Sequence, residues 1–260
     1  MGKDVLVEIA RYSPESDIEI SFESYEVPFH KEWVVLDALN YIKDKVDGSL
    51  TYRWSCRMGI CGSCGMMVDG EPKLACATFL EGDKIRVEPL RYFPVIRDLV
   101  TELDDFLEKL KTVKPWLIRD KEQPISAGEY LQTPEELENY KQYSMCINCT
   151  LCYAACPIVG LDSQFVGPAA IALAQRYNKD SRDVGTEERM AILAHPEGIW
   201  GCTFVGECTR VCPKHVDPAG AIQQYKLKAV IDWARSLIIP ARHNDRSLGV
   251  GDVRDENKAA

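Results

Sequence analysis

The sequence predicts an α+β chain in which a mixed β/α domain is followed by an all-helical domain. Residues 3 to 11 and 17 to 27 alternate polar and apolar side chains, the period expected of half-buried strands. From Thr133-Pro134, an N-cap followed by proline at the first helical position, the patterns indicate helices only. At 260 residues the chain is long enough for two domains, each with its own core.

The first domain is predicted to have the order ββαβ with a loop rich in cysteine. Residues 13 to 16 form the turn between the first two strands, which therefore pair as a hairpin. Residues 34 to 46 carry apolar side chains at helical spacing and predict a helix laid on the sheet. The cysteine loop spans residues 52 to 64, a short hairpin follows around 67 to 71, and the last strand lies near 84 to 88.

A long amphipathic helix over residues 95 to 113 is predicted to leave this domain. Its apolar face would consist of Ile96, Leu99, Val100, Leu103, Phe106, Leu107 and Leu110. Residues 114 to 133 contain two prolines and little periodicity, which indicates a connecting segment. After it, further helices are expected at residues 168 to 177, 186 to 194 and 218 to 237.

These patterns divide the chain into four parts. Residues 1–105 form the first domain, 106–133 the end of the connecting helix and a linker, and 134–240 the helical domain. Residues 241–260 are polar and are expected to be a loosely held tail.

Composition excludes several classes of protein. The formal net charge of −9 argues against nucleic acid as a partner, because a protein that binds phosphates needs a basic face. No uninterrupted apolar run approaches the roughly 20 residues that span a bilayer, so a membrane role is expected to pass through a partner. The N-terminus does not resemble a secretory signal, so the eleven cysteines favour metal binding over the alternative of a disulfide framework.

The first four cysteines have the spacing of a plant-type [2Fe-2S] centre. Cys56, Cys61 and Cys64 follow the CxxxxCxxC pattern, and Cys76 follows further on. Nearby glycines, Gly59, Gly62 and Gly65, would allow unusual backbone angles and bring several backbone N–H groups toward the cluster. Zinc is the alternative, because four thiolates also suit a tetrahedral Zn²⁺ ion.

The other seven cysteines lie in two related runs. Residues 146 to 157 read CINCTLCYAACP, the CxxCxxCxxxCP run whose fourth cysteine, in two-cluster ferredoxins, ligates the other cluster. Residues 202 to 213 repeat this spacing, with Val205 in place of the second cysteine.

If the fourth cysteines cross over, the two sites differ in their number of ligands. One site would hold four thiolates, those of Cys146, Cys149, Cys152 and Cys212. The other would hold only three, those of Cys156, Cys202 and Cys208, with the apolar Val205 at the fourth corner. A cubane with one apolar corner should lose that iron, so we expect one [4Fe-4S] and one [3Fe-4S] cluster. The alternative is an ordinary four-iron site in which water or hydroxide completes the ligand set.

The three motifs in this order resemble the iron–sulfur subunit of the succinate dehydrogenase and fumarate reductase family, over essentially the whole chain to about residue 240. The runs CINCTLCYAACP, FVGPAAIALAQRYNKDSRD and WGCTFVGECTRVCPKHVDPAGAIQQYK look most like bacterial quinol:fumarate reductase. The resemblance implies an N-terminal β-grasp, plant-type ferredoxin-like domain followed by an all-helical, bacterial-ferredoxin-like domain. It also implies that all eleven cysteines are cluster ligands, with the crossed pairing above.

The same resemblance implies an electron-transfer subunit of a membrane-bound enzyme. Electrons would pass from menaquinol or ubiquinol through [3Fe-4S], [4Fe-4S] and [2Fe-2S] to the covalent FAD of a flavoprotein subunit, where fumarate is reduced. One or two hydrophobic anchor subunits would hold the chain at the cytoplasmic face of the bacterial inner membrane. The chain itself shows no dinucleotide fingerprint and no His/Arg cluster for a dicarboxylate. The alternatives are a succinate dehydrogenase running in the opposite direction and a free soluble ferredoxin.

The resemblance further favours Gln223 and Lys226 as residues that help bind the quinone head group. In succinate dehydrogenases a tryptophan and a histidine of this subunit often reach the quinone, and Leu161 and Thr203 stand at about those positions here. The competing interpretation of Lys226 is a solvated helix lysine.

Overall fold

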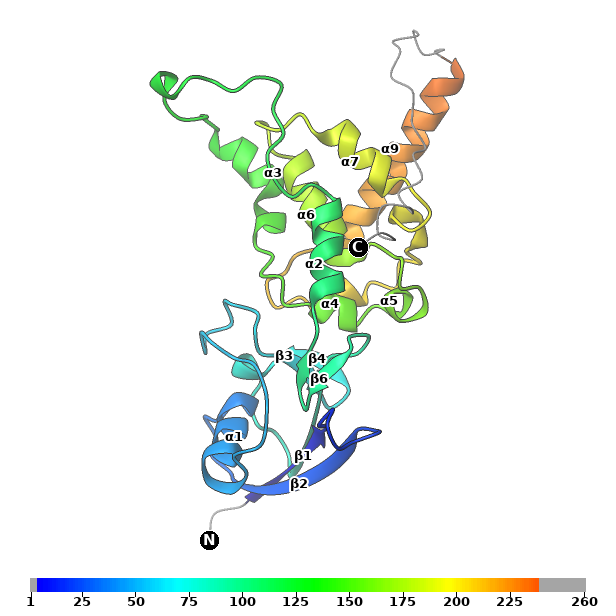
Figure 1. The fold of residues 1–260 in the computed structure, drawn as a ribbon. Helices are drawn as coiled ribbons and strands as arrows, with labels where there is room; N and C mark the ends of the chain where they lie inside the picture. Colours follow the sequence, from blue (N-terminus) through cyan, green and yellow to red (C-terminus); the bar gives the residue numbers. More distant parts are fainter. Residues whose placement is uncertain (1–3, 239–260) are drawn as a thin grey trace.

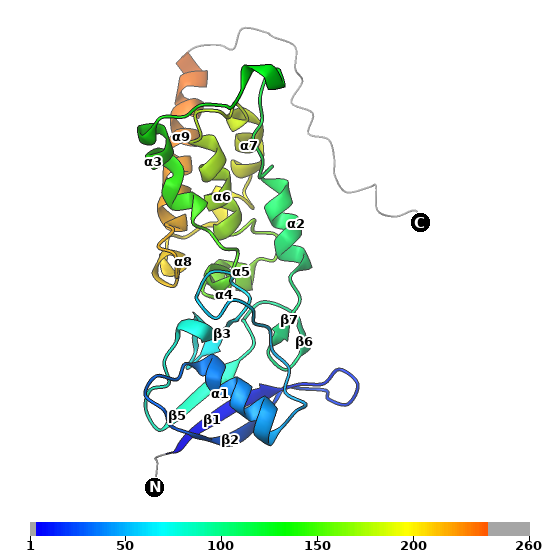
Figure 2. The same ribbon diagram turned by 90° about the vertical axis from the view of Figure 1, so that its left-hand side faces the viewer.

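The computed structural model describes residues 4–238, and the predicted tail at 241–260 lies outside the described residues. The described chain forms an elongated molecule with the β-sheet domain at one end and the helical domain at the other (Figure 1). Helix α2 runs from the first domain alongside the helices of the second (Figure 2). The predicted α+β class and the order of its two parts are confirmed.

The first domain is built on a five-stranded sheet with the order β2-β1-β5-β3-β4. The strands are β1 (Asp4–Arg11), β2 (Ser21–Pro28), β3 (Gly65–Val68), β4 (Glu71–Leu74) and β5 (Lys84–Glu88). Strand β1 pairs with β2 in an antiparallel register and with β5 in a parallel one. The two predicted hairpins and the last strand are thus confirmed, although the second strand begins at Ser21 and not at residue 17.

Helix α1 (Val35–Tyr41) covers the sheet and continues into a wider π-helical turn, Ile42–Val46, as the predicted helix over 34–46 required. The carboxylate of Asp37 accepts a hydrogen bond from the backbone N–H of Val34 and so caps the first turn. Residues at helical spacing, among them Leu36 and Leu39, are buried in the core of the domain.

The long helix predicted over residues 95 to 113 is wrong in its first half. The chain forms a short hairpin, β6 (Val95–Arg97) and β7 (Val100–Thr101), before helix α2 (Asp104–Thr112) begins. The turn is held by Asp98, which has a left-handed φ of 44° and whose N–H donates to the carbonyl of Tyr12. Its buried carboxylate accepts hydrogen bonds from the backbone N–H groups of Tyr12 and Thr51. These bonds to residues distant in the sequence stabilise the turn, so the segment does not form the helix that its apolar spacing predicted.

Replacing Asp98 by alanine is therefore expected to destabilise the first domain by roughly 3 kcal/mol, because two backbone N–H groups and the Arg11 guanidinium lose a charged acceptor. This loss would be measured as a lower midpoint temperature for the disappearance of the cluster absorption in the visible spectrum on heating. The control is Glu15→Ala, which removes an exposed ion pair with Arg97 and an exposed hydrogen bond from the Ser13 hydroxyl and should leave the midpoint almost unchanged. Equal midpoints for the two variants would contradict the role given to Asp98.

The connecting segment has little regular structure, as predicted, and contains only a single turn of 3-10 helix at Ile125–Ala127. It ends at Thr133, whose side chain accepts a hydrogen bond from the N–H of Glu136 at 3.2 Å. The Glu136 carboxylate in turn accepts from the N–H of Thr133 at 2.7 Å, which completes a capping box. Helix α3 (Pro134–Ser144) starts here as the sequence predicts.

The helices of the second domain pack around a separate hydrophobic core. Its remaining elements are α4 (Leu151–Ala154), α5 (Pro157–Leu161), α6 (Pro168–Asn178), α7 (Thr186–Leu193), a 3-10 turn (Ile199–Gly201), α8 (Glu207–Arg210) and α9 (Pro218–Ile238). The three helices predicted at 168, 186 and 218 are confirmed. Within residues 4–238 no helix combines the length and the apolar character needed to cross a membrane.

Candidate iron–sulfur centres

The first cysteine loop directs backbone N–H groups at one thiol. The Sγ atom of Cys56 accepts from the N–H groups of Met58, Ile60 and Cys61 at 3.3 to 3.5 Å. A left-handed φ of +66° at Gly59 allows the loop to curl around the sulfur. These three hydrogen bonds are the main reason that the pKa of Cys56 falls to about 6, which favours the thiolate that iron requires.

The sheet brings two further cysteines of this motif, Cys64 and Cys76, together. Cys64 directly precedes β3, and Cys76 lies in the 3-10 turn Ala75–Ala77 that follows β4. Because β3 and β4 are paired, the N–H of Ala75 donates to the carbonyl of Cys64 at 3.0 Å. Burial first, and then the neighbouring Cys76 thiol, raise the pKa of Cys64 to about 12. The sequence-predicted set thus meets around one loop and one hairpin.

Four cysteines of the helical domain line a single apolar pocket. They are Cys146, Cys149, Cys152 and Cys212. Cys212 comes from the second run, at residues 202 to 213. Burial is the largest cause of the raised pKa of Cys146, and the charge of the Cys212 thiolate raises it further. The end of one run therefore lies against the beginning of the other.

A second pocket is lined by Cys156, Cys202 and Cys208. Burial and then the charge of Cys156 raise the pKa of Cys208 to about 12, although these residues belong to different runs. Val205, which occupies the place of a fourth cysteine in the sequence, lines the same pocket. Each run thus contributes its last cysteine to the pocket of the other.

The donor chemistry of these pockets fits iron–sulfur clusters. Burial is the leading cause of a raised pKa at every shifted thiol of the helical domain, and it raises the pKa of Cys149 to about 11. A buried thiol becomes a thiolate only when a cation compensates its charge, and iron supplies that charge. Among residues 4–238, no three His, Cys, Asp or Glu side chains gather closely enough to hold a single metal ion.

The three sites follow one another along the molecule. A pocket between the domains is lined from one side by Cys61 and Ser63 and from the other by Asn148 and Cys149. Further on, the charge of Cys208 contributes, after burial and nearer thiols, to the raised pKa of Cys152. The first site therefore adjoins the second, and the second adjoins the third.

Of the two residues predicted at a quinone, Lys226 lies beside the third site. Its Nζ donates to the carbonyl of Cys202 at 2.7 Å and lies 5.8 Å from the ring centre of Trp200. This lysine is partly buried, and its contact with a quinone stays a prediction. Gln223 lies three residues earlier on α9, and its Nε2 is buried without a hydrogen-bond partner.

Leu161 and Phe204 are exposed, at 83% and 58% of their residue surface. Sequence reasoning missed the left-handed backbone angles of Asn148 and Thr150 inside the run at residues 146 to 157. Asparagine tolerates this conformation well, but Thr150 is β-branched and gives no such signal.

Two family models match the chain in the order of its domains. Residues 6–108 match a 2Fe-2S iron–sulfur cluster binding domain, and residues 142–216 match a 4Fe-4S dicluster domain.

Curated relatives match almost the whole chain. The fumarate reductase iron–sulfur subunit of Mycobacterium tuberculosis is 59% identical over 91% of this chain and 97% of its own length. The corresponding subunit of Haemophilus influenzae is 51% identical over 90% of this chain and 96% of its own. A chain in the solved apo form of the Mycobacterium smegmatis Sdh1 complex matches 92% of this chain and all of its own length, with a TM-score of 0.78 and 28% identity. On these grounds the chain belongs to the family of iron–sulfur subunits of fumarate reductases and succinate dehydrogenases.

Proposed function

We propose that this chain is the electron-transfer subunit of a membrane-bound quinol:fumarate reductase. The observation that carries the proposal is the row of three thiol sites, which begins in the β-sheet domain and continues through the helical domain. Each cluster accepts and passes one electron, so such a row conducts electrons between two redox partners. The similarity to fumarate reductase subunits at 51% to 59% identity favours fumarate reduction over succinate oxidation as the direction.

In this proposal each site has its own cysteines. Cys56, Cys61, Cys64 and Cys76 would hold [2Fe-2S], whereas Cys146, Cys149, Cys152 and Cys212 would hold [4Fe-4S]. The three-iron cluster would be held by Cys156, Cys202 and Cys208. The grouping of these thiols around separate pockets supports the crossed pairing. The proposed boundaries between the first domain, the connecting part, the helical domain and the tail lie after residues 105, 133 and 240.

The partners follow from this role. A flavoprotein subunit with covalent FAD would face the [2Fe-2S] domain, and hydrophobic anchor subunits would face the [3Fe-4S] site at the cytoplasmic side of the inner membrane. Lys226 and Gln223 would contact the head group of menaquinone or ubiquinone. The position of Lys226 against Cys202, and the unpartnered amide nitrogen Nε2 of Gln223, support this placement.

Purification from membranes tests the proposal directly. A tagged chain is expected to copurify with a flavoprotein and with hydrophobic subunits, and the preparation should oxidise a quinol analogue and reduce fumarate. The alternative of a free soluble ferredoxin predicts recovery from the cytosol without either partner.

Replacing Val205 by cysteine should convert the three-iron site into a four-iron site, because a thiolate would then complete the fourth corner of the pocket. Loss of the three-iron EPR signal from the oxidised complex, with a new signal after reduction, is the expected result. Val205→Ala is the control and should keep three irons. An unchanged three-iron signal in Val205→Cys would mean that Val205 does not face the vacant corner.

A further inference from the structure

We propose that Gly62 and Gly65 are positioning residues that set the separation between the [2Fe-2S] and [4Fe-4S] clusters. This inference rests on the proposed function and assigns the two glycines a role in the contact between domains. Because glycine has no side chain, these two positions leave room for the cysteine loop of the helical domain.

Both glycines lie directly against the backbone of the cysteine run at residues 146 to 157. A Cβ atom on Gly62 would lie 2.7 Å from the carbonyl oxygen of Ile147 and 3.0 Å from Cα of Cys149. A Cβ atom on Gly65 would lie 2.9 Å from the carbonyl oxygen of Cys149. Backbone atoms cannot rotate away as a flexible side chain does, so a methyl group at either position must move one loop away from the other.

The opposing loop has little freedom to yield within its own domain. Asn148 and Thr150 already have left-handed backbone angles, with φ of 52° and 62°. Thr150 is buried, and its hydroxyl donates to the carbonyl of Cys149 at 2.6 Å. The loop would therefore move together with the elements to which it is fixed, and the two domains would separate at this point.

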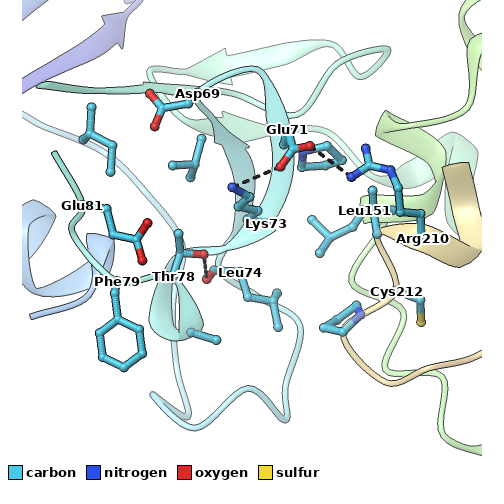
Figure 3. A pocket seen from close by; sticks show the side chains of 16 residues that line it. Asp69, Glu71, Lys73, Leu74, Thr78, Phe79, Glu81, Leu151, Arg210 and Cys212 are labelled. Atoms are coloured by element: carbon cyan, nitrogen blue, oxygen red, sulfur yellow. Dashed lines mark hydrogen bonds and ion pairs between the residues drawn. The ribbon is translucent and has the colours of Figure 1, made fainter. Parts of the chain in front are cut away.

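Two further contacts fix this part of the helical domain on the sheet. Leu151 is buried in the core of the first domain. Arg210 forms an ion pair with Glu71 of strand β4 at 3.0 Å, and Figure 3 shows this pair reaching across from the helical domain. The close approach at Gly62 and Gly65 is therefore part of a wider interface between the domains.

Gly59 provides a matched comparison within the same loop. Its φ of +66° is close to the +75° of Gly62, so alanine would strain the backbone similarly at both positions. A Cβ atom on Gly59, however, would meet nothing within 4 Å. Strain in the loop and contact between the domains can thus be separated by experiment.

The distance between the [2Fe-2S] and [4Fe-4S] clusters matters because a single electron crosses it without any bond being broken or any proton being transferred. The rate of such a transfer falls steeply with distance, and the magnetic dipolar coupling between two reduced clusters falls with the cube of distance. A small displacement of the loops would therefore weaken both quantities.

The test compares Gly62→Ala, Gly65→Ala and Gly59→Ala in the purified complex, reduced so that both clusters carry an unpaired electron. Iron content and the separate EPR signals first establish that the clusters are present. We expect the dipolar broadening between the [2Fe-2S] and [4Fe-4S] signals to decrease more in Gly62→Ala and Gly65→Ala than in Gly59→Ala, which strains the loop without meeting the other domain.

Unchanged coupling in both Gly62→Ala and Gly65→Ala would overturn the inference, as would an equal decrease in Gly59→Ala. Loss of the [2Fe-2S] cluster from both Gly62→Ala and Gly65→Ala would also overturn it, because the glycines would then serve the cluster loop itself. Absence of the clusters from the unaltered complex would instead refute the proposed function.

Discussion

Replacing Cys212 by alanine is expected to abolish the [4Fe-4S] signal and to leave the [3Fe-4S] signal in place. The physical reason is the pocket that Cys212 shares with Cys146, Cys149 and Cys152, although it stands in the other run of the sequence. Cys156→Ala should have the reverse effect, because Cys156 lies with Cys202 and Cys208. Low-temperature EPR of the oxidised and the reduced complex separates the two signals. Quinol-dependent fumarate reduction should be lost in both variants, since each interrupts the row of clusters.

The two variants control each other, because each removes one partly buried thiol from the same domain. If each cysteine instead served the cluster of its own run, Cys156→Ala would damage the four-iron cluster and Cys212→Ala the three-iron cluster. That exchange of phenotypes would show that the runs do not cross.

Asp183→Ala should strongly loosen the attachment of the connecting segment to the helical domain. The carboxylate forms an ion pair with Arg189 at 2.6 Å, and both side chains are fully buried. Arg189 also donates to the carbonyls of Lys114 and Trp116, which begin the connecting segment. Burial would raise the pKa of Asp183, but hydrogen bonds from Arg189 and from backbone N–H groups outweigh it, so the pKa is lowered and the carboxylate stays charged.

Removing one partner leaves the other charge buried and unpaired, which costs about 3 to 5 kcal/mol. Native-state hydrogen exchange at the amides near Ile118, which donates to Asp183, should therefore accelerate by roughly two to four orders of magnitude. Asp232→Ala is the control, because its ion pair with Lys228 is exposed and should contribute at most about 0.5 kcal/mol. Equal exchange rates in both variants would mean that the buried pair does not hold the segment.

Local periodicity was sufficient to predict most of the elements from the sequence. The alternation of β1 and β2 and the capping signals at Thr133 depend on neighbouring residues only, and these elements formed as expected. The segment at 95–101 failed because its structure depends on distant partners. Asp98 contacts residues 12 and 51, and helical spacing carries no information on such contacts.

The cysteine sites were partly predictable for a similar reason. Spacing identifies the runs, and the vacancy at Val205 is visible in the sequence itself. Which cysteine meets which depends on how α4 and α8 pack, and spacing alone left this open. Gly62 and Cys149 belong to different domains and are separated by 86 residues of chain, so no local pattern could have indicated their contact.

EPR spectroscopy of the unaltered complex tests the central claim most directly, namely that this chain holds three different clusters in a row. The oxidised complex should show a signal from the three-iron cluster alone, because oxidised two-iron and four-iron clusters carry no net spin. Stepwise reduction should then bring up the [2Fe-2S] and [4Fe-4S] signals. A complex that is silent when oxidised and shows only four-iron signals on reduction would contradict both the ligand assignment and the role of Val205.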